Sequence, residues 1–164
     1  MSQDVEKKLE HIASTEQVSI NFLATQCLRK YVDWDYYADR FGISLLPTVT
    51  LAKLLTFTTD QKAAQLGRWA ARNVAKEFTV FWFRDFSVKA ALKILELLGS
   101  RYAGRFEYVH DATEKEHVVI LKHGMGRKWS IYYEHLVRTV FGELLGKKVE
   151  VDRMENQVLA RIQE

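Results

Sequence analysis

The feature that most constrains the fold is a set of nine apolar residues that repeat with helical spacing in the last quarter of the sequence. They lie 0, 3, 4, 7, 8, 11, 12, 15 and 16 residues from the first of the set, which consists of Trp129, Tyr132, Tyr133, Leu136, Val137, Val140, Phe141, Leu144 and Leu145. Spacings of three and four residues place all of them on one side of a helix, and such a side must be buried. The pattern predicts a core helix from about Trp129 to Leu145, ended by Gly146.

The segments around this helix carry strand patterns. Alternating β-branched and aromatic residues predict two hairpins, formed by residues 105–111 with 117–123 and by residues 148–152 with 157–162. The run FTVFWF at residues 78–83 predicts a further strand, and Ser87 then caps a helix that ends at Gly99. The order strand, helix, strand, strand, helix, strand, strand predicts an α+β fold. It matches a ferredoxin-like (split βαβ) antiparallel sheet with two helices and an extra terminal strand.

Residues 1–77 carry helical patterns only. Apolar residues recur at three- and four-residue spacing over about residues 4–15, from Ser19 to Gly42, after Pro47, and from Thr59 to about Lys76. The sequence has one proline and no Gly/Ser-rich tract, so no flexible linker is expected. We therefore predict a helical part over residues 1–77 and an α+β part over residues 78–164.

Composition excludes several classes of protein. Lys and Arg number 24 against 21 Asp and Glu, and the formal charge of +3 is far from the excess of a dedicated nucleic-acid binder. Cys27 is the only cysteine, which excludes an intramolecular disulfide framework, and the sequence starts without the pattern of a secretory leader. The longest apolar run, residues 78–83, is about a third of a membrane span. We expect a cytoplasmic protein with no membrane partner.

Motifs for catalysis do not occur in the sequence. It contains no nucleophile elbow, no HExxH and no neighbouring cysteine and histidine, and Cys27 falls on an apolar helix face. We therefore assign no catalytic residue and no cofactor, and expect a protein that is not an enzyme.

The run EKKLEHIASTEQVSINFLATQCLRKYVDW, residues 6–34, resembles the two helices of the ribbon-helix-helix family. The match lies in the entry Val18-Ser19 and in the helix positions Leu9, Ile12, Ala13, Leu23, Cys27, Leu28 and Tyr31. In that family the helices interlock in a dimer, and a strand ahead of the first helix enters the DNA major groove. The resemblance implies a homodimer formed through Leu23, Cys27, Leu28 and Tyr31, with residues 1–77 as the dimerisation part. Only Met1 to Gln3 precede Asp4, so we expect the DNA-reading strand to be missing.

The turn HGMGRKW ahead of the core helix is a candidate anion site. Its residues are His123, Gly124, Met125, Gly126, Arg127, Lys128 and Trp129. A helix start presents unpaired backbone N–H groups, glycines let a ligand approach the backbone, and two cations add positive charge. The turn matches neither GxGxxG nor GxxxxGK[ST], so it predicts a carboxylate or phosphate and not a nucleotide. The alternative is a tight turn between strand and helix with solvated cations.

A pair of histidines is the weak candidate for metal binding. If the hairpin turn covers residues 112–115, His110 lies opposite His117 and Asp111 lies opposite Glu116. Two facing imidazoles have chelating spacing, but two ligands do not close a metal site, so we assign no metal. The alternative is an ordinary or pH-sensitive pair.

The cations Arg68, Arg72 and Lys76 recur at four-residue intervals and could follow a phosphate backbone, the alternative being a solvated helix face. Together with the resemblance, this stripe predicts a dimeric transcription-regulator-like protein that contacts DNA through phosphates. Its α+β part would sense a small anionic ligand. The alternative, from another class, is a dimeric interaction or scaffold protein that does not bind DNA.

Overall fold

The computed structural model describes residues 2–44 and 46–164 and shows an α+β protein, as the sequence predicts. The chain divides into two compact units, residues 1–43 and residues 44–164. The boundary predicted between residues 77 and 78 falls inside a helix, α6 (Lys76–Phe83), and the helices of residues 46–77 belong to the same compact unit as the sheet.

The first unit is helical. Its elements are α1 (Gln3–Glu16), α2 (Ile20–Lys30), a π-helical segment (Tyr31–Asp35) and α3 (Tyr36–Phe41). The Ser19 hydroxyl accepts a hydrogen bond from the Phe22 N–H at 3.1 Å and so caps α2, as predicted. Gly42 ends α3 with a φ of +78°, a conformation that glycine adopts without strain. The predicted helices are confirmed here.

The second unit contains the remaining helices. They are α4 (Thr48–Thr56), α5 (Asp60–Ala70), α6, α7 (Val88–Glu96) and α8 (Arg127–Val137), with π-helical segments at Ala71–Ala75, Leu97–Arg101 and Arg138–Leu144. Hydroxyls of Thr59 and Ser87 cap α5 and α7, which confirms both predicted starts. Within the described ranges, no helix is long and apolar enough to cross a membrane.

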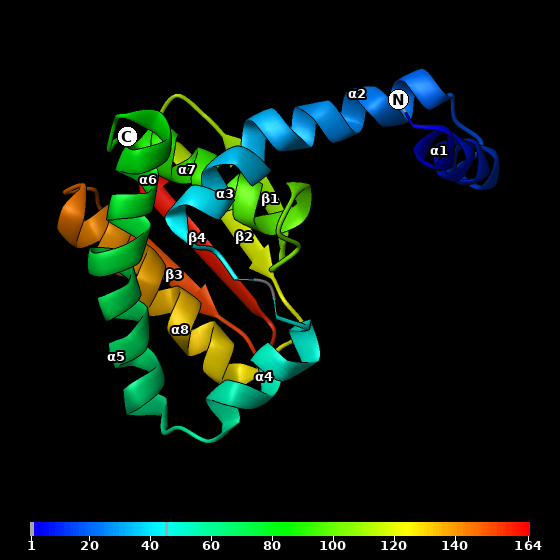
Figure 1. Ribbon diagram of the computed structural model, residues 1–164. Coiled ribbons are helices and arrows are strands. Elements are labelled where there is room, and N and C mark those ends of the chain that lie inside the picture. The colour runs from blue at the N-terminus through cyan, green and yellow to red at the C-terminus, as the bar shows by residue number, and fades with distance from the viewer. Residues whose placement is uncertain (1, 45) are drawn as a thin grey trace. The chain divides into compact units, whose positions relative to one another are not determined.

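The strand predicted over residues 78–83 is wrong, because this segment is α6. It follows α5 and the π-helical segment without a break, so residues 60–83 run as one continuous helix (Figure 1). Phe78, Thr79 and Trp82 are buried, a spacing of three and four residues that suits a helix. The pattern of a short apolar run fits a buried strand and a buried helix equally well. Here the run continues the preceding helix and is therefore helical.

The described part of the chain forms one antiparallel sheet with the order β1-β2-β4-β3. Its strands are β1 (Glu107–Ala112), β2 (Glu116–Lys122), β3 (Val149–Arg153) and β4 (Gln157–Gln163). Both predicted hairpins are present, and β2 pairs with β4 between them. The split βαβ order is not confirmed, because the segment assigned to its first strand is helical.

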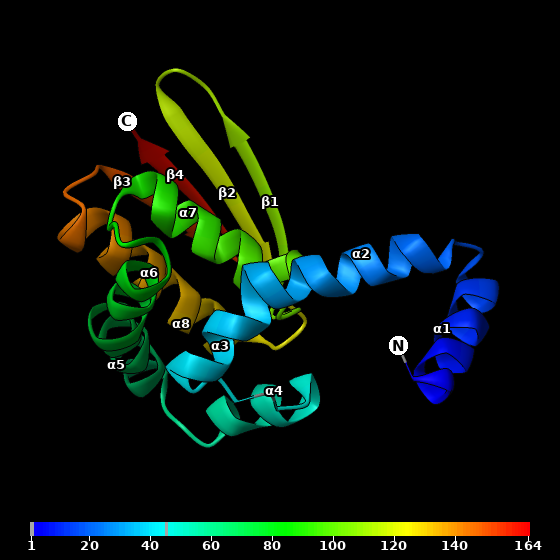
Figure 2. The ribbon, with the colours of Figure 1, turned by 45° about the horizontal axis from the view of Figure 1, so that its top comes forward.

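Two helices, α7 and α8, lie on the same face of this sheet (Figure 2). The predicted stripe on α8 is buried at Tyr133 and Val137 and continues at Val140 and Phe141 in the π-helical segment. These residues share one core with the inner residues of β2 and β4, which are Val119, Leu121, Val158, Ala160 and Ile162.

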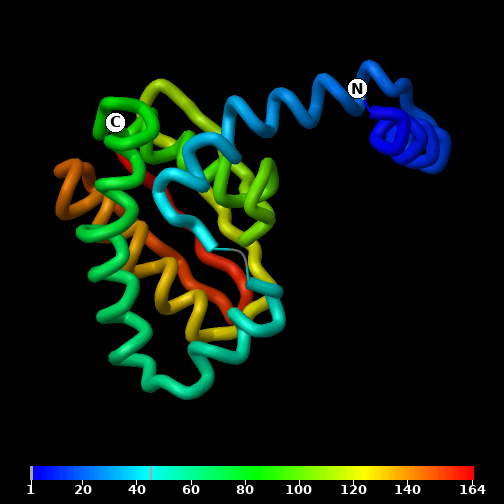
Figure 3. Tube along the Cα trace, viewed as in Figure 1, coloured from blue at the N-terminus to red at the C-terminus, as the bar shows by residue number. Residues whose placement is uncertain are grey.

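A second layer forms where α5 lies along α8 (Figure 3). The two helices approach most closely at Gly67, where an added Cβ would overlap the carbonyl oxygen of Tyr132 and stand 3.2 Å from the Cβ of His135. Only a residue without a side chain permits this approach. It brings the cationic side of α5 onto α8.

Candidate functional site

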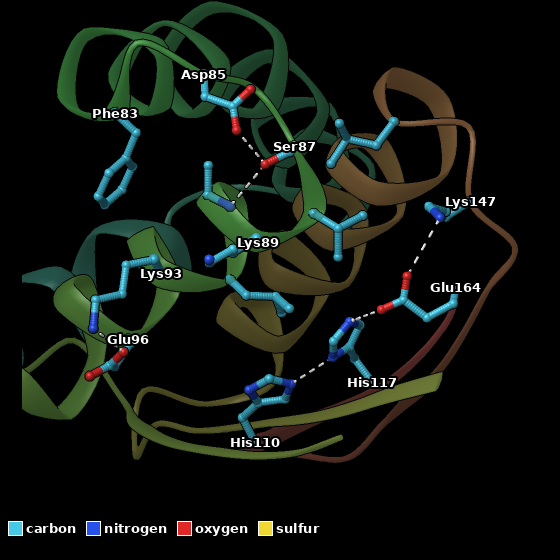
Figure 4. A pocket seen from close by; sticks show the side chains of 14 residues that line it. Phe83, Asp85, Ser87, Lys89, Lys93, Glu96, His110, His117, Lys147 and Glu164 are labelled. Atoms are coloured by element: carbon cyan, nitrogen blue, oxygen red, sulfur yellow. Dashed lines mark hydrogen bonds and ion pairs between the residues drawn. The ribbon is translucent and has the colours of Figure 1, made fainter. Parts of the chain in front are cut away.

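A cavity of about 1110 Å³ opens in the second unit beside the N-terminal half of α7 (Figure 4). Apolar side chains from three segments form part of its lining, including Phe83, Val88, Leu92 and Leu145. Charged and polar groups complete the lining; they are Asp85, Ser87, Lys89, Lys93, Glu96, His110, His117, Lys147 and Glu164. An apolar cavity of this size with a few convergent polar groups is typical of a small-molecule site.

The two candidate histidines meet in this cavity. His110 Nε2 lies 3.0 Å from His117 Nδ1, and the ring centroids are 5.1 Å apart. Both side chains belong to the helix-covered face of the sheet, because His117 lies two residues before the buried Val119 on β2 and His110 lies directly opposite Val119 on β1. The strands therefore direct both imidazoles into the space beside α7.

The register predicted for this hairpin is wrong by two residues. His117 lies opposite Ala112, and His110 lies opposite Val119. The Thr113 N–H donates to the Glu116 carbonyl at 2.9 Å, which leaves only two residues in the loop instead of four. The Thr113 hydroxyl also accepts from the Glu116 N–H and tightens the turn. A shift of two keeps each residue on its face, so the histidines are diagonal neighbours and still touch.

A carboxylate and a lysine extend the histidine pair into a chain of four polar groups. Glu164 Oε1 lies 2.6 Å from His117 Nε2, and Glu164 Oε2 lies 3.9 Å from Lys147 Nζ. An ionised carboxylate only accepts hydrogen bonds, so His117 carries its proton on Nε2. His117 Nδ1 then accepts, and His110 Nε2 donates to it. This arrangement fixes the tautomers of both rings.

Electrostatics in the cavity favour neutral imidazole at His110. Partial burial, reinforced by the neighbouring His117, lowers the pKa of His110 below its usual value of 6.5. On the opposite wall, partial burial opposes ionisation of Glu96, but hydrogen bonds from Lys93 and Arg101 at 2.7 and 2.9 Å hold its pKa below the usual range. Glu96 is therefore a paired carboxylate, because Lys93 and Arg101 compensate its negative charge.

The predicted anion turn before α8 receives a carboxylate from the chain itself. Glu155 Oε1 accepts from the Arg127 N–H at 3.2 Å, and Asn156 Oδ1 accepts from the Gly126 N–H at 2.8 Å. The helix starts at Arg127, two residues before the predicted start at Trp129. An external anion at this turn would have to compete with Glu155, and the anion site here stays a prediction.

The other residues of this turn have structural partners. His123 is buried, with Nε2 2.9 Å from the Ser130 hydroxyl and Nδ1 accepting from the Met125 N–H; burial lowers its pKa. The remaining contacts are Arg127 with Asp60 at 3.0 Å, Lys128 Nζ with the Thr58 carbonyl, and Trp129 Nε1 with the Leu51 carbonyl at 2.8 Å. Gly124 borders a second cavity of about 520 Å³ together with Glu155 and Asn156.

Two of the cations predicted to contact phosphate, Arg68 and Arg72, lie beside α8 and the π-helical segment that continues it, and the third, Lys76, lies near Phe86. Arg68 approaches His135 Nδ1 at 3.1 Å, Arg72 forms an ion pair with Glu143, and Lys76 lies 5.8 Å from the Phe86 ring centre. The Arg72 side chain remains 51% exposed. All three cations therefore have contacts within the chain.

Residues assigned to the dimer interface lie in α2, except Tyr31, which begins the π-helical segment that follows. Leu28 and Tyr31 expose 66% and 53% of their surface, Cys27 is exposed, and Leu23 is half-buried. Phe22 and Val32 add further exposed apolar surface to the same unit. These exposures are compatible with a role in association.

Sequence reasoning missed Glu164, Lys147, Glu155 and Asn156. The alternation of β4 carried a signal for Glu164, because it continues the buried face formed by Val158, Ala160 and Ile162.

Among the described residues, no group of three or more His, Cys, Asp or Glu side chains is arranged to hold a metal ion. The chain matches no protein-family model, and comparison with curated proteins and with solved structures finds no match either.

Proposed function

We propose that the protein is a dimeric, regulator-like protein whose second unit binds a small anionic ligand in the cavity of His110 and His117. The observation that carries the ligand site is the convergence of two imidazoles and Lys89 on a partly apolar cavity, whose other lysines, Lys93 and Lys147, lie beside Glu96 and Glu164. Glu96 and Glu164 are each paired with cations or imidazole of the wall. A carboxylate or phosphate with an apolar body suits this lining.

Calorimetric titration tests the ligand site. Phosphate, short carboxylates and medium-chain carboxylates would be titrated into the wild type and into Lys89→Ala, His110→Ala and Arg127→Ala. We expect an apolar carboxylate to bind the wild type, Lys89→Ala and His110→Ala to weaken it, and Arg127→Ala to leave it unchanged. Weakening by Arg127→Ala alone would move the site to the turn before α8. Equal binding by all three variants would refute both placements.

The pH dependence offers a second readout of the same site. Protonation of His110 adds positive charge to the cavity, and its pKa is lowered from 6.5. Affinity for the anion is therefore expected to be low at neutral pH and to rise as pH falls below 6.5. His110→Gln is expected to remove most of this rise.

For the dimer, the proposal rests on the exposed apolar side chains of the first unit. Leu28→Glu and Tyr31→Glu place a charge in the proposed interface and should lower the mass measured by light scattering from dimer to monomer. Val49→Glu is the matched control, because Val49 is 78% exposed and lies in the second unit. A wild type that is monomeric at high micromolar concentration would refute this part.

Contact with DNA would use Arg68, Arg72 and Lys76 against phosphates. Affinity for duplex DNA should fall steeply as salt rises, and Arg72→Ala with Lys76→Ala should reduce the salt dependence by about one unit of slope per cation. Arg72→Ala also removes the ion pair between Arg72 and Glu143. The control for this loss is Glu143→Ala, which breaks the same ion pair but keeps the Arg72 cation and should not weaken DNA binding.

The alternative is a cytoplasmic interaction protein that dimerises and does not bind DNA. The engagement of Arg68 and Arg72 with the chain's own side chains favours this alternative. A dimer that fails to bind duplex DNA at low salt would establish it over the regulator.

A further inference from the structure

We propose that His110 and His117 chelate a late first-row divalent metal ion, with Glu164 orienting His117 from behind. This proposal does not depend on the anion site or on dimerisation. It rests on the distance between two ring nitrogens, on the hydrogen bond at the far side of one ring, and on the open space in front of the pair.

The distance between His110 Nε2 and His117 Nδ1 is 3.0 Å. Two imidazole nitrogens bound to one metal at about 2.0–2.1 Å and separated by this distance subtend an angle of about 94° at the metal. That angle suits neighbouring positions of square-planar or octahedral coordination, and an increase of about 0.3 Å would reach the tetrahedral angle. The two side chains already lie at chelating distance.

The change from hydrogen bond to metal site needs no net loss of a proton. Neutral His110 donates from Nε2 in the free protein, and a metal at Nε2 requires that proton to move to Nδ1. His117 Nδ1 already presents a lone pair. Because His110 is exposed, its ring can turn so that both lone pairs point at one ion.

Glu164 supplies the contact that metal-bound histidines usually have. Its Oε1 accepts from His117 Nε2 at 2.6 Å, which fixes the ring and makes Nδ1 a better donor to a metal. Lys147 lies 3.9 Å from the other oxygen of this carboxylate and holds it in place. The side chain of His117 is only 16% exposed, so its orientation is set before any ion arrives.

Water molecules would complete the coordination. The pair faces the cavity of about 1110 Å³, so the remaining positions of the ion are open. Imidazole ligands favour zinc, nickel and copper over magnesium and calcium. We therefore expect selectivity for the late transition metals and an affinity well below that of a closed structural zinc site.

Calorimetric titration with Ni²⁺ and Zn²⁺, in a buffer free of organic anions, tests the proposal. One ion per chain is expected, with Mg²⁺ giving no heat. His110→Ala and His117→Ala should each abolish binding, whereas His11→Ala, an exposed histidine in α1, should leave it unchanged. Broadening of the His110 and His117 ring resonances by Ni²⁺ would locate the ion independently. Binding by the wild type that survives in His117→Ala overturns the site, as does the absence of binding.

The role of Glu164 has its own test. Glu164→Ala should weaken the metal 10- to 100-fold, the range seen when such a partner of a ligand is removed. Glu150→Ala is the matched control, since Glu150 is an exposed acid of the same sheet with a lysine 3.7 Å away. Equal affinity of Glu164→Ala and the wild type would remove Glu164 from the site. Thermal unfolding of each variant without metal distinguishes loss of a ligand from loss of the fold.

Discussion

Replacement of Gly67 by alanine is expected to separate two helices that the structure holds in contact. The added Cβ would overlap the Tyr132 carbonyl oxygen and stand 3.2 Å from both His135 Cβ and the Leu136 nitrogen. Two of these atoms belong to the α8 backbone, so no side chain can rotate away, and the helices must part by roughly 1 Å to restore van der Waals contact.

The magnitude follows from two opposing effects. Overpacking of this kind costs about 1–3 kcal/mol or more, whereas alanine in place of a helical glycine contributes up to about 1 kcal/mol. Gly142→Ala isolates the second effect, because its Cβ would meet only atoms at 3.9 and 4.0 Å. We expect Gly67→Ala to lower the free energy of unfolding by about 2 kcal/mol relative to Gly142→Ala, which is roughly 4–8 °C in melting temperature for a chain of this size.

Thermal melting followed by circular dichroism and urea unfolding would measure both variants. The midpoint should fall for Gly67→Ala with little change in the urea m-value, and it should stay level or rise for Gly142→Ala. A Gly67→Ala protein that melts at or above the wild type would show that α5 and α8 do not meet as closely as described. A parallel loss in both variants would refute the contact argument as well.

Three further sets of substitutions test separate parts of the structure. Burial lowers the pKa of His123 in the folded state below 6.5, so the stability that this residue contributes is complete above pH 6.5 and is lost as pH falls toward the folded pKa. His123→Gln should therefore reduce the dependence of the free energy of unfolding on pH below 6.5, by up to about 1.4 kcal/mol per pH unit. Urea unfolding between pH 5 and 8 would measure this, and equal slopes would contradict it. Ser87→Ala should cost about 1 kcal/mol by removing the α7 cap, whereas Ser87→Thr, which keeps the hydroxyl between the Ala90 N–H and Asp85, should restore most of it in the same melts. A double-mutant cycle between Asp60 and Arg127 should give a coupling below about 1 kcal/mol, since both side chains are about half exposed; a larger value would show that the pair is shielded from solvent.

The sequence was most informative where structure depends on residues a few positions apart. Ser19, Thr59 and Ser87 each cap a helix through a group three residues away, and all three starts were predicted. The apolar stripe of α8 was also predicted, because its three- and four-residue spacing repeats over enough residues to exclude a strand. Residues 78–83 were assigned wrongly because six apolar residues are too few to show a period, and the helix that precedes them determines their structure.

The candidate site depended more on distant residues. Alternation placed His110 and His117 on one face, and that prediction survived an error in register because the error was an even number of residues. The residue that completes the pair, Glu164, is 47 positions from His117; alternation along β4 indicates its face, but its contact with His117 depends on the pairing of β2 with β4. Glu155 lies 28 positions from the helix start it caps, a distance over which the sequence carries no cap signal.

The cap of α8 also bears on the order in which the chain folds. The helices α5 and α7 begin with caps, Thr59 and Ser87, that are synthesised with the first turn, but the N–H groups of Gly126 and Arg127 depend on Asn156 and Glu155 from the turn between β3 and β4. On the ribosome these partners emerge about thirty residues after the helix start. The first turn of α8 therefore matures only when the last hairpin closes. In a refolding experiment, its amide protons should gain protection from exchange together with those of β4 and after those of α7.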